Sequence, residues 1–236
     1  MRPPGPSIAA IIPTLNEAAN LADAIRSVRL AEFDEIVVCD GGSSDGTQEI
    51  ASSIRGIKVL TVPRGRGQQL AAGFEATESP IVAIVHADCR LPSEAGAAIR
   101  KITEDHAVVG GCFRLSFDQS SALMGLYGWL SRFDTPFTTF GDQVMFARRE
   151  TLDRMGSMPN LPLFEDVVLR KRLRREGRFV KLSPLVRTSA RRYRKHGAIR
   201  TQVLNGLMLI AFLAGCPVDR LYRLYYGAEA ARMPDD

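Results

Sequence analysis

Residues 35–47, EIVVCDGGSSDGT, decide the fold. The first half of this stretch is an apolar run that ends on a carboxylate, Asp40, and the second half is rich in glycine and serine, which favour turns. Short apolar runs followed by polar or glycine-rich loops recur at residues 7–12, 57–62 and 81–85. Runs that are apolar throughout predict strands that are buried on both faces of a sheet.

Helical patterns separate these four predicted strands. Within residues 17–29, Leu21, Ala24, Ile25 and Val28 recur at the spacing of one helix face, so an amphipathic helix is predicted with Asn16 as its N-cap. Strands that alternate with helices indicate an α/β fold with a mainly parallel sheet. Further helices are predicted up to about residue 53 and over residues 67–77 and 92–104.

The loops that follow the four strands carry the unusual residues. They are residues 13–17 (PTLNE), 40–47, 64–68 (RGRGQ) and 86–88 (HAD). In a parallel sheet these loops share one edge, and ligands bind outside the carboxyl ends of the strands. A cap or a turn explains each loop alone, but four such loops at one edge predict a binding site.

Several nucleotide-binding and catalytic motifs are absent from the chain. There is no GxxxxGK[ST] sequence, which excludes a P-loop, and no GxSxG sequence. Residues 64–73 contain GxG, but Leu70 stands where a dinucleotide fingerprint needs its third glycine. The four cysteines form no CxxC pair, so a zinc cage or redox motif is not expected.

Three acids are candidates for chemistry. Asp88 is a carboxylate in the loop directly after an apolar strand, a position typical of divalent-cation ligands. The alternative is a helix-capping role before Pro92. Glu165 and Asp166 precede a predicted helix over residues 167–176. The helix dipole alone accounts for acids there, and it also favours an ionised carboxylate that could accept a proton.

Taken in order, residues 12–17 (IPTLNE), 40–47, 86–88 and 165–166 resemble glycosyltransferase family 2. A subgroup of short bacterial members is the closer match, through residues 86–92 (HADCRLP) and 141–143 (GDQ). The resemblance implies the GT-A fold, with a mixed, mainly parallel sheet flanked by helices and a C-terminal helical extension.

The resemblance also implies a domain organisation and an activity. One GT-A domain is expected over residues 1–236, comprising a nucleotide-sugar half (7–118), an acceptor and catalytic half (119–190) and a basic, helical extension (191–236). The implied reaction moves a sugar, with inversion, from a nucleotide-diphosphate donor, for which UDP is the expected nucleotide, to an acceptor hydroxyl.

Residue roles follow from the same resemblance. Asp166 matches the general base, and Asp88 matches the ligand of a divalent metal, Mn²⁺ or Mg²⁺, on the donor diphosphate. Acceptor or sugar contacts are expected from Gly141, Asp142, Gln143 and Glu165, and donor contacts from Pro13, Thr14, Asn16, Glu17, Asp40, Arg66, Gln68 and Asp88.

One departure from the family pattern concerns the metal. His86 replaces the first acid of the family's DxD motif, so metal binding then depends on Asp88, the donor phosphates and a further ligand. His196 is the candidate, because it is the only histidine in the C-terminal region. The alternative is a surface histidine in a basic stretch.

Charge is distributed unevenly along the chain. Residues 1–118 carry 11 basic and 15 acidic side chains, residues 119–236 carry 20 and 11, and residues 170–200 carry 13 and one. Such a segment favours an anionic partner, which is phosphate, a membrane surface or nucleic acid, and the alternative is a solvated helix face. Residues 201–218 hold no charge but are short and interrupted for a membrane span, so a core helix, a homodimer helix or a helix on the membrane surface is expected.

Two other functions stay open at this stage. A nucleotidyltransferase shares the α/β layout, but residues 10–20 lack the basic residue that its early loop carries. A non-catalytic basic module that binds membrane or nucleic acid is the second alternative. Nucleic acid is the less favoured partner, because the basic segment has only Phe179 and Tyr193 for base stacking. Scattered cysteines and the lack of a signal sequence predict a cytoplasmic protein, in peripheral contact with the inner face of the membrane and a lipid-linked acceptor.

Overall fold

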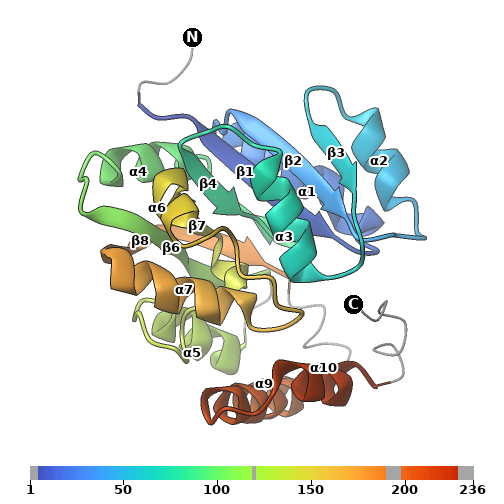
Figure 1. The fold of residues 1–236 in the computed structure, drawn as a ribbon, viewed down its shortest axis with the longest axis vertical. Helices are drawn as coiled ribbons and strands as arrows, with labels where there is room; N and C mark the ends of the chain where they lie inside the picture. The colour runs from blue at the N-terminus through green and yellow to red at the C-terminus, as the bar shows by residue number, and fades with distance from the viewer. Residues whose placement is uncertain (1–4, 119–120, 190–197, 228–236) are drawn as a thin grey trace.

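An eight-stranded mixed sheet forms the centre of the molecule, and helices pack against both of its faces (Figure 1). The strand order is β3-β2-β1-β4-β7-β6-β8-β5. The structure is a computed structural model that describes residues 5–118, 121–189 and 198–227.

The first half of the chain alternates strands with helices, and its first four strands run parallel in the order β3-β2-β1-β4. The four strands and four helices predicted from the sequence are confirmed, with differences of a few residues at their ends. The strands are β1 (Ile8–Thr14), β2 (Glu35–Asp40), β3 (Lys58–Thr61) and β4 (Ile81–Ile84), and the helices are α1 (Ala18–Leu30), α2 (Thr47–Ser53), α3 (Arg66–Glu75) and α4 (Ala95–Ile102).

The second half of the chain makes the sheet mixed. Strand β7 runs antiparallel to both β4 and β6, β8 is parallel to β6, and β5 is antiparallel to β8. This brings β5, which directly follows Asp88, beside the end of β8. The elements are β5 (Cys89–Arg90), β6 (Val108–Phe117), α5 (Ala122–Leu130), the 3-10 turn η1 (Gly141–Gln143), β7 (Met145–Arg148), α6 (Arg149–Arg154), α7 (Glu165–Glu176) and β8 (Arg178–Thr188).

Alternate side chains of the strands form two core layers. In β1, Ile8 and Ile12 belong to the layer that includes α1 and α4 residues, whereas Ile11 belongs to the layer that includes α3 and α7 residues. All three side chains are buried because helices cover both faces. This double burial is why the strands are apolar throughout and do not alternate with polar residues.

The predicted cap of α1 is wrong. Asn16 lies one residue before the N-cap position, with φ +55°, and Glu17 occupies that position without a capping side chain of its own. The first N–H groups of the helix are bonded from the next loop instead: Ala18 N donates to Asp45 Oδ2 at 3.0 Å and Glu17 N to Thr47 Oγ1 at 2.9 Å. A cap supplied from 27 or more residues away has no local sequence signal.

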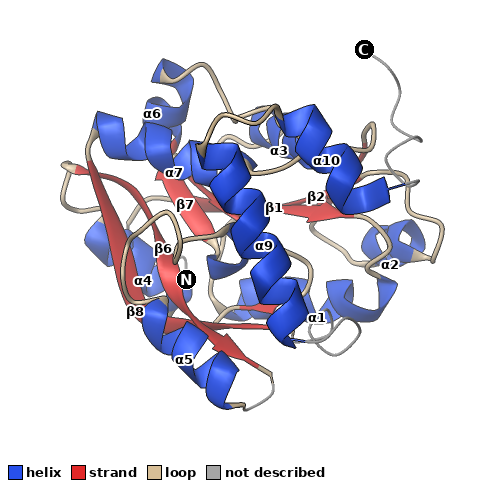
Figure 2. Cartoon of the chain, turned by 90° about the horizontal axis from the view of Figure 1, so that it is seen from below, coloured by secondary structure: helices blue, strands red, loops and turns tan. Residues whose placement is uncertain are grey.

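The uncharged stretch at residues 201–218 forms most of one helix and the turn after it. Helix α9 (Ala198–Leu213) ends before Gly215, which has φ +89°, and α10 (Val218–Tyr226) follows. The two helices lie across one end of the molecule (Figure 2). In the described ranges, none of the helices combines the length and the apolar character that crossing a bilayer requires.

One face of α9 packs on the molecule and the other does not. Met208 and Leu209 are buried, and Phe212 stacks on Phe164, with ring centroids 4.7 Å apart. Leu207 and Ile210 are 60% and 55% exposed. The expectation of a core helix therefore holds for one face of α9 only.

Candidate functional site

The loops after β1 to β4 meet at one edge of the sheet because these four strands are parallel neighbours. The loop after β2 is shaped around Asp40, whose side chain is fully buried. Its Oδ2 accepts from the backbone N–H groups of Gly42 at 3.0 Å and Ser43 at 2.9 Å, and its Oδ1 accepts from Thr14 Oγ1 at 3.2 Å. The buried carboxylate of Asp40 thus fixes the conformation of the loop through hydrogen bonds to its backbone.

Asn16 joins the first loop to the second. Its Oδ1 accepts from Ser44 N at 2.9 Å, and its backbone N donates to Ser43 Oγ at 2.9 Å. The side chain of Asn16 is exposed, and those of Pro13 and Glu17 on the same loop are half-buried. Three predicted donor contacts therefore lie at the surface of this edge.

Gln69 is a structural residue of the site that the sequence interpretation missed. Its side chain is buried, and its Nε2 donates to the carbonyl oxygens of Thr14 at 2.7 Å and Cys39 at 2.8 Å, the ends of β1 and β2. The only sequence signal was its place in the glycine-rich entry to α3. Gln68, which was predicted as a donor contact, is half-buried in the first turn of the same helix.

His86 in the loop after β4, Gly141 in η1 and Asp166 in α7 come together. Gly141 N donates to Asp166 Oδ2 at 2.6 Å. A Cβ atom at Gly141 would lie 2.9 Å from His86 Nε2 and 3.3 Å from Asp166 Oδ2. Glycine at position 141 therefore allows the loop after β4 and the start of α7 to approach each other.

The carboxylate of Asp142 is partly buried in a position that disfavours its negative charge. Its Oδ1 is buried and has no hydrogen-bond partner among the described residues. The pKa of Asp142 is raised to about 7, chiefly by burial and also by the negative charges of Asp88 and Asp166, while Lys181 and Arg66 oppose the shift. The residues predicted for metal binding and proton transfer thus lie close enough to Asp142 to repel its charge.

Glu165 is buried against Arg66. The two side chains form an ion pair at 3.2 Å between Arg66 Nη1 and Glu165 Oε1, which links α3 to α7 across 99 positions of the chain. Burial raises the pKa of Glu165 to about 6, although the nearby guanidinium of Arg66 opposes this. The Arg66 side chain is 38% exposed, so part of it stays open to solvent while it pairs with Glu165.

Gln143 does not face the edge of the sheet. It is fully buried, its Nε2 donates to the carbonyl oxygen of Thr138 at 2.7 Å, and its Oε1 accepts from Lys181 Nζ. The interior position lowers the pKa of Lys181. The structure therefore corrects the expectation that Gln143 contacts the sugar. Its side chain instead stabilises the Gly-Asp-Gln turn through hydrogen bonds in the protein interior.

Unfavourable backbone conformations concentrate at this site. Five described residues other than glycine have positive φ, and three of them are Asn16 (+55°), Val144 (+50°) and Phe164 (+62°). Val144 directly follows the Gly-Asp-Gln turn, and Phe164 directly precedes Glu165. Such conformations cost free energy, most of all for a β-branched residue, and they persist where the surroundings enforce one geometry.

The described residues alone do not form a complete metal site. Within residues 5–118, 121–189 and 198–227, no three histidine, cysteine or acidic side chains are grouped so that they could hold a metal ion. The excess of carboxylates around Asp142 nevertheless fits a cation, because Asp88 and Asp166 raise its pKa. His196, the predicted additional ligand, lies outside the described residues.

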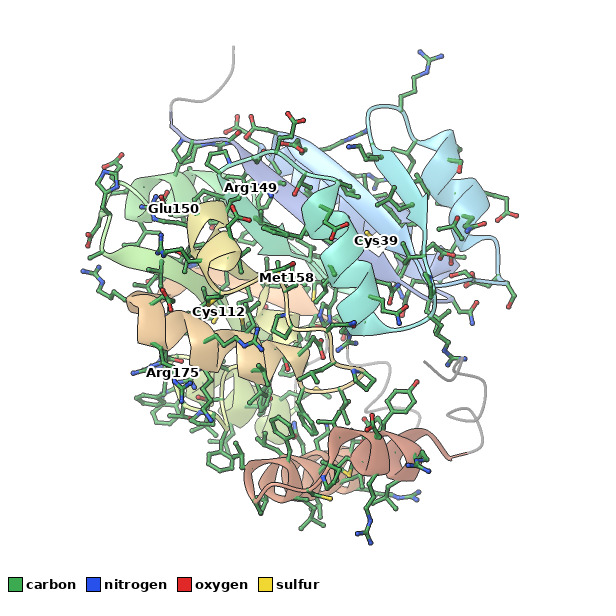
Figure 3. The ribbon with its side chains drawn as sticks, viewed as in Figure 1. Cys39, Cys112, Arg149, Glu150, Met158 and Arg175 are labelled. Atoms are coloured by element: carbon green, nitrogen blue, oxygen red, sulfur yellow. The ribbon has the colours of Figure 1, made fainter. Side chains whose placement is uncertain are left out.

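The basic segment is partly structural. Arg170 and Arg174 both pair with Asp134, and Arg178 pairs with Asp105 at 2.9 Å. Arg175 lies on the outer part of α7 and is exposed (Figure 3). Exposed side chains of α7, not all of the basic segment, are thus available to an anionic partner.

Comparison with known sequences gives one family. The model described as glycosyl transferase family 2 matches residues 9–152. Glycosyltransferase AglJ of Haloferax volcanii is 34% identical over 83 residues, which are 35% of this chain and 27% of AglJ. The hexosyltransferase Agl6 of low-salt glycan biosynthesis, from the same organism, is 34% identical over 89 residues, 36% of this chain and 21% of Agl6. These matches span less than a third of the curated relatives.

Solved structures share the fold. Residues 1–349 of S. aureus TarS in complex with UDP-GlcNAc align with a TM-score of 0.64 at 17% identity, over 78% of this chain and 58% of that one. The mannosyltransferase PcManGT from Pyrobaculum calidifontis, in complex with GDP-Man and Mn²⁺, aligns with a TM-score of 0.64 at 20% identity, over 96% and 69%. The architecture is that of GT-A glycosyltransferases, as the sequence predicted.

Proposed function

The chain belongs to glycosyl transferase family 2, and on that premise we propose that it moves a sugar from a nucleotide-diphosphate donor to an acceptor hydroxyl with inversion. The observation that carries the proposal is the meeting of Asp166 with His86 and Gly141, next to Asp142 and the charge of Asp88. Nucleotide sugars occupy two proteins of the same fold, which supports this class of donor.

The nucleoside is proposed to lie over the loops after β1 and β2. Pro13, Asn16 and Glu17 supply the accessible contacts, whereas Thr14 and Asp40 are buried beneath them and keep the two loops in one shape. This refines the expected role of Asp40, whose oxygens are already engaged by the backbone of its own loop.

The diphosphate is proposed to lie between Asp88 and the start of α3. Arg66 and Gln68 would contact it from α3, and Asp88 would hold a divalent cation together with the phosphates, with His196 as a further candidate ligand. When bound, such a cation offsets the negative charge on the leaving diphosphate. Glu165 keeps Arg66 in place for this contact.

Asp166 is proposed to take the proton of the acceptor hydroxyl as the new glycosidic bond forms and the bond to the diphosphate breaks. Two backbone N–H groups orient it: Gly141 N donates to Oδ2 at 2.6 Å and Val167 N donates to Oδ1 at 2.8 Å. Asp142 and Gly141 lie where the sugar or the acceptor would contact them, and Gln143 supports their turn from inside.

A donor screen tests the proposed reaction. The protein is melted with UDP-, GDP- and dTDP-sugars, with and without Mn²⁺, and release of the nucleoside diphosphate is then measured for each donor that raises the melting temperature. We expect one nucleotide class to stabilise the protein and to be hydrolysed slowly without acceptor. Nucleoside triphosphates with a sugar phosphate are assayed in parallel: release of pyrophosphate from them would favour a nucleotidyltransferase, and no turnover of any nucleotide would favour a non-catalytic module.

Peripheral membrane contact is proposed for the exposed face of α9. Val203, Leu207 and Ile210 form an exposed apolar face of α9, and Arg200 in the first turn of this helix and Arg220 on α10 are also exposed. A helix with an apolar face and flanking arginines binds anionic bilayer surfaces. Contact of this kind would bring the site to a lipid-linked acceptor.

A further inference from the structure

A groove outside the candidate site lies between α5 and the last part of β6. Its volume is about 380 Å³, and the residues that matter for its chemistry are Arg114, Ser116, Phe117, Gly125, Trp129 and Arg132. None of these residues belongs to the family motifs on which the proposed reaction rests.

The groove exists because α5 presents glycines to the strand. Gly125 and Gly128 lie on the helix face that lines it, together with Trp129 and Arg132. A Cβ atom at Gly128 would lie 3.0 Å from the Leu115 carbonyl oxygen, so the helix touches β6 there, whereas a Cβ atom at Gly125 would meet nothing within 4 Å. The helix thus contacts the strand at one glycine and leaves a hollow at the other.

The groove holds two guanidinium groups without a balancing acid. Arg114 Nε is buried and has no hydrogen-bond partner in the described ranges. The guanidinium of Arg132 lies over the ring of Trp129, with 5.1 Å between its carbon and the ring centroid. No aspartate or glutamate is among the residues that line the groove. Arginine pairs bind phosphate oxygens through parallel N–H groups, so this charge set fits a phosphate.

The strands connect the groove to the site. Phe117, at the end of β6, pairs with Thr188, and Thr188 pairs with Cys89 on the other side of β8. Ser189 N then donates to the Asp88 carbonyl oxygen at 3.2 Å. Arg114 lies three residues before the end of β6, which corresponds to about 10 Å of strand.

We propose that this groove binds a phosphate group carried by the acceptor. The assignment rests on the proposed function, because the groove would give an anionic acceptor a cationic anchor beside β6, two strands from β5, which directly follows Asp88. Leu126 and Phe133, on and just after α5, are 54% and 45% exposed, so the phosphate can belong to a soluble sugar phosphate or to a lipid headgroup.

The only tryptophan of the chain is in the groove, which gives a direct measurement. Trp129 fluorescence is titrated with inorganic phosphate and with glycerol phosphate, and separately with vesicles of phosphatidylglycerol or of phosphatidylcholine. Phosphate that draws Arg132 away from the ring should change the emission. Arg114→Gln and Arg132→Gln are each expected to weaken the response about tenfold. Arg26→Gln, an exposed arginine on α1, is the matched control and should respond like the wild type.

The outcomes separate the sources and can overturn the proposal. A response to the soluble phosphates that depends on both groove arginines supports a sugar phosphate, and one confined to phosphatidylglycerol vesicles with the same dependence supports a lipid phosphate. No response in the wild type, or an equal response in Arg114→Gln, Arg132→Gln and Arg26→Gln, overturns it. Gly125→Leu, which fills the hollow, should also abolish the response while the protein still melts cooperatively. No donor is present, so failure here leaves the donor screen unaffected.

Discussion

Asp142 and Asp166 are close neighbours with different surroundings. Two backbone N–H groups bind the carboxylate of Asp166, whereas one oxygen of Asp142 is buried without a partner in the part of the chain that the structure describes. Because the carboxylate of Asp166 is held in one orientation, it suits proton transfer. The unpartnered oxygen of Asp142 suits a hydrogen bond or a cation contact that a bound substrate would supply.

Replacement of Asp166 tests its proposed role as the base. Asp166→Asn keeps the size of the side chain and an oxygen for Gly141 N, but the amide cannot take a proton. We expect turnover to fall about 10²- to 10⁴-fold, with donor affinity little changed. Initial rates and donor titrations measure both quantities, and Asp153→Asn, an exposed acid on α6, serves as control. Turnover near that of the wild type would rule out the assignment.

Replacement of Asp142 should change how stability depends on pH. Its pKa is about 7 in the folded protein and 3.8 as the ordinary value, so between these values the folded state binds more protons than the unfolded state. The free energy of unfolding therefore falls as the pH rises from about 4 to about 7, by up to about 4 kcal/mol for this group. Asp142→Asn removes this loss.

Urea denaturation at pH 5 and pH 8 measures the effect. The wild type should lose more stability between the two values than Asp142→Asn does. Glu165, whose pKa is also raised, is present in both proteins and cancels in the comparison. Equal losses in the two proteins would show that the Asp142 carboxyl is not held in the protonated form.

At the scale of elements, two glycines in helices have opposite surroundings. A Cβ atom at Gly67 in α3 would lie 2.4 Å from Leu161 N and 2.8 Å from Asn160 Cα, both backbone atoms. The loop at residues 160–161 leads directly into Phe164 and the start of α7. Helix α3 and the segment before the proposed base are therefore packed with no space between them.

Matched alanine substitutions use this contrast. Gly67→Ala should destabilise the protein by about 1–3 kcal/mol, because backbone atoms must move, and it should lower turnover by displacing the loop before Asp166. Gly125→Ala in α5 enters open space and should stabilise by about 0.5–1 kcal/mol through helix propensity. Thermal melts and donor hydrolysis measure both variants. A stable, active Gly67→Ala would contradict the close packing of α3 on this loop.

The regular elements of the first half could be predicted because their signals are local. Buried strands appear as apolar runs, and α1 repeats its apolar residues with helical period. The cap of α1 by Asp45 and the bridge of Gln69 between two strand ends could not be predicted, because each joins residues far apart in the sequence. The inward turn of Gln143 depends on Lys181, which is 38 positions away.

At the scale of the whole molecule, the helical extension contacts the segment that carries the proposed base. Phe212 of α9 stacks on Phe164, which directly precedes Glu165 and has φ +62°. The face of α9 that makes this contact is opposite the exposed one, so a surface bound to the exposed face would lie on the far side of the helix from α7. The proposed membrane contact and the contact with the segment before Asp166 thus use different faces of α9.

Charge substitution on the exposed face of α9 tests membrane contact in the whole protein. Leu207→Glu combined with Ile210→Glu places two negative charges on the surface proposed to meet anionic lipid, so flotation with phosphatidylglycerol vesicles at low salt should be lost. Leu30→Glu is the control, because Leu30 is 65% exposed on α1 and belongs to no such face. Both proteins should hydrolyse a soluble donor at the wild-type rate, since Phe212, which stacks on Phe164, is unchanged in both. If the double variant floats as the wild type does, another surface binds the vesicles; if the wild type does not float, the proposed membrane contact of α9 is wrong.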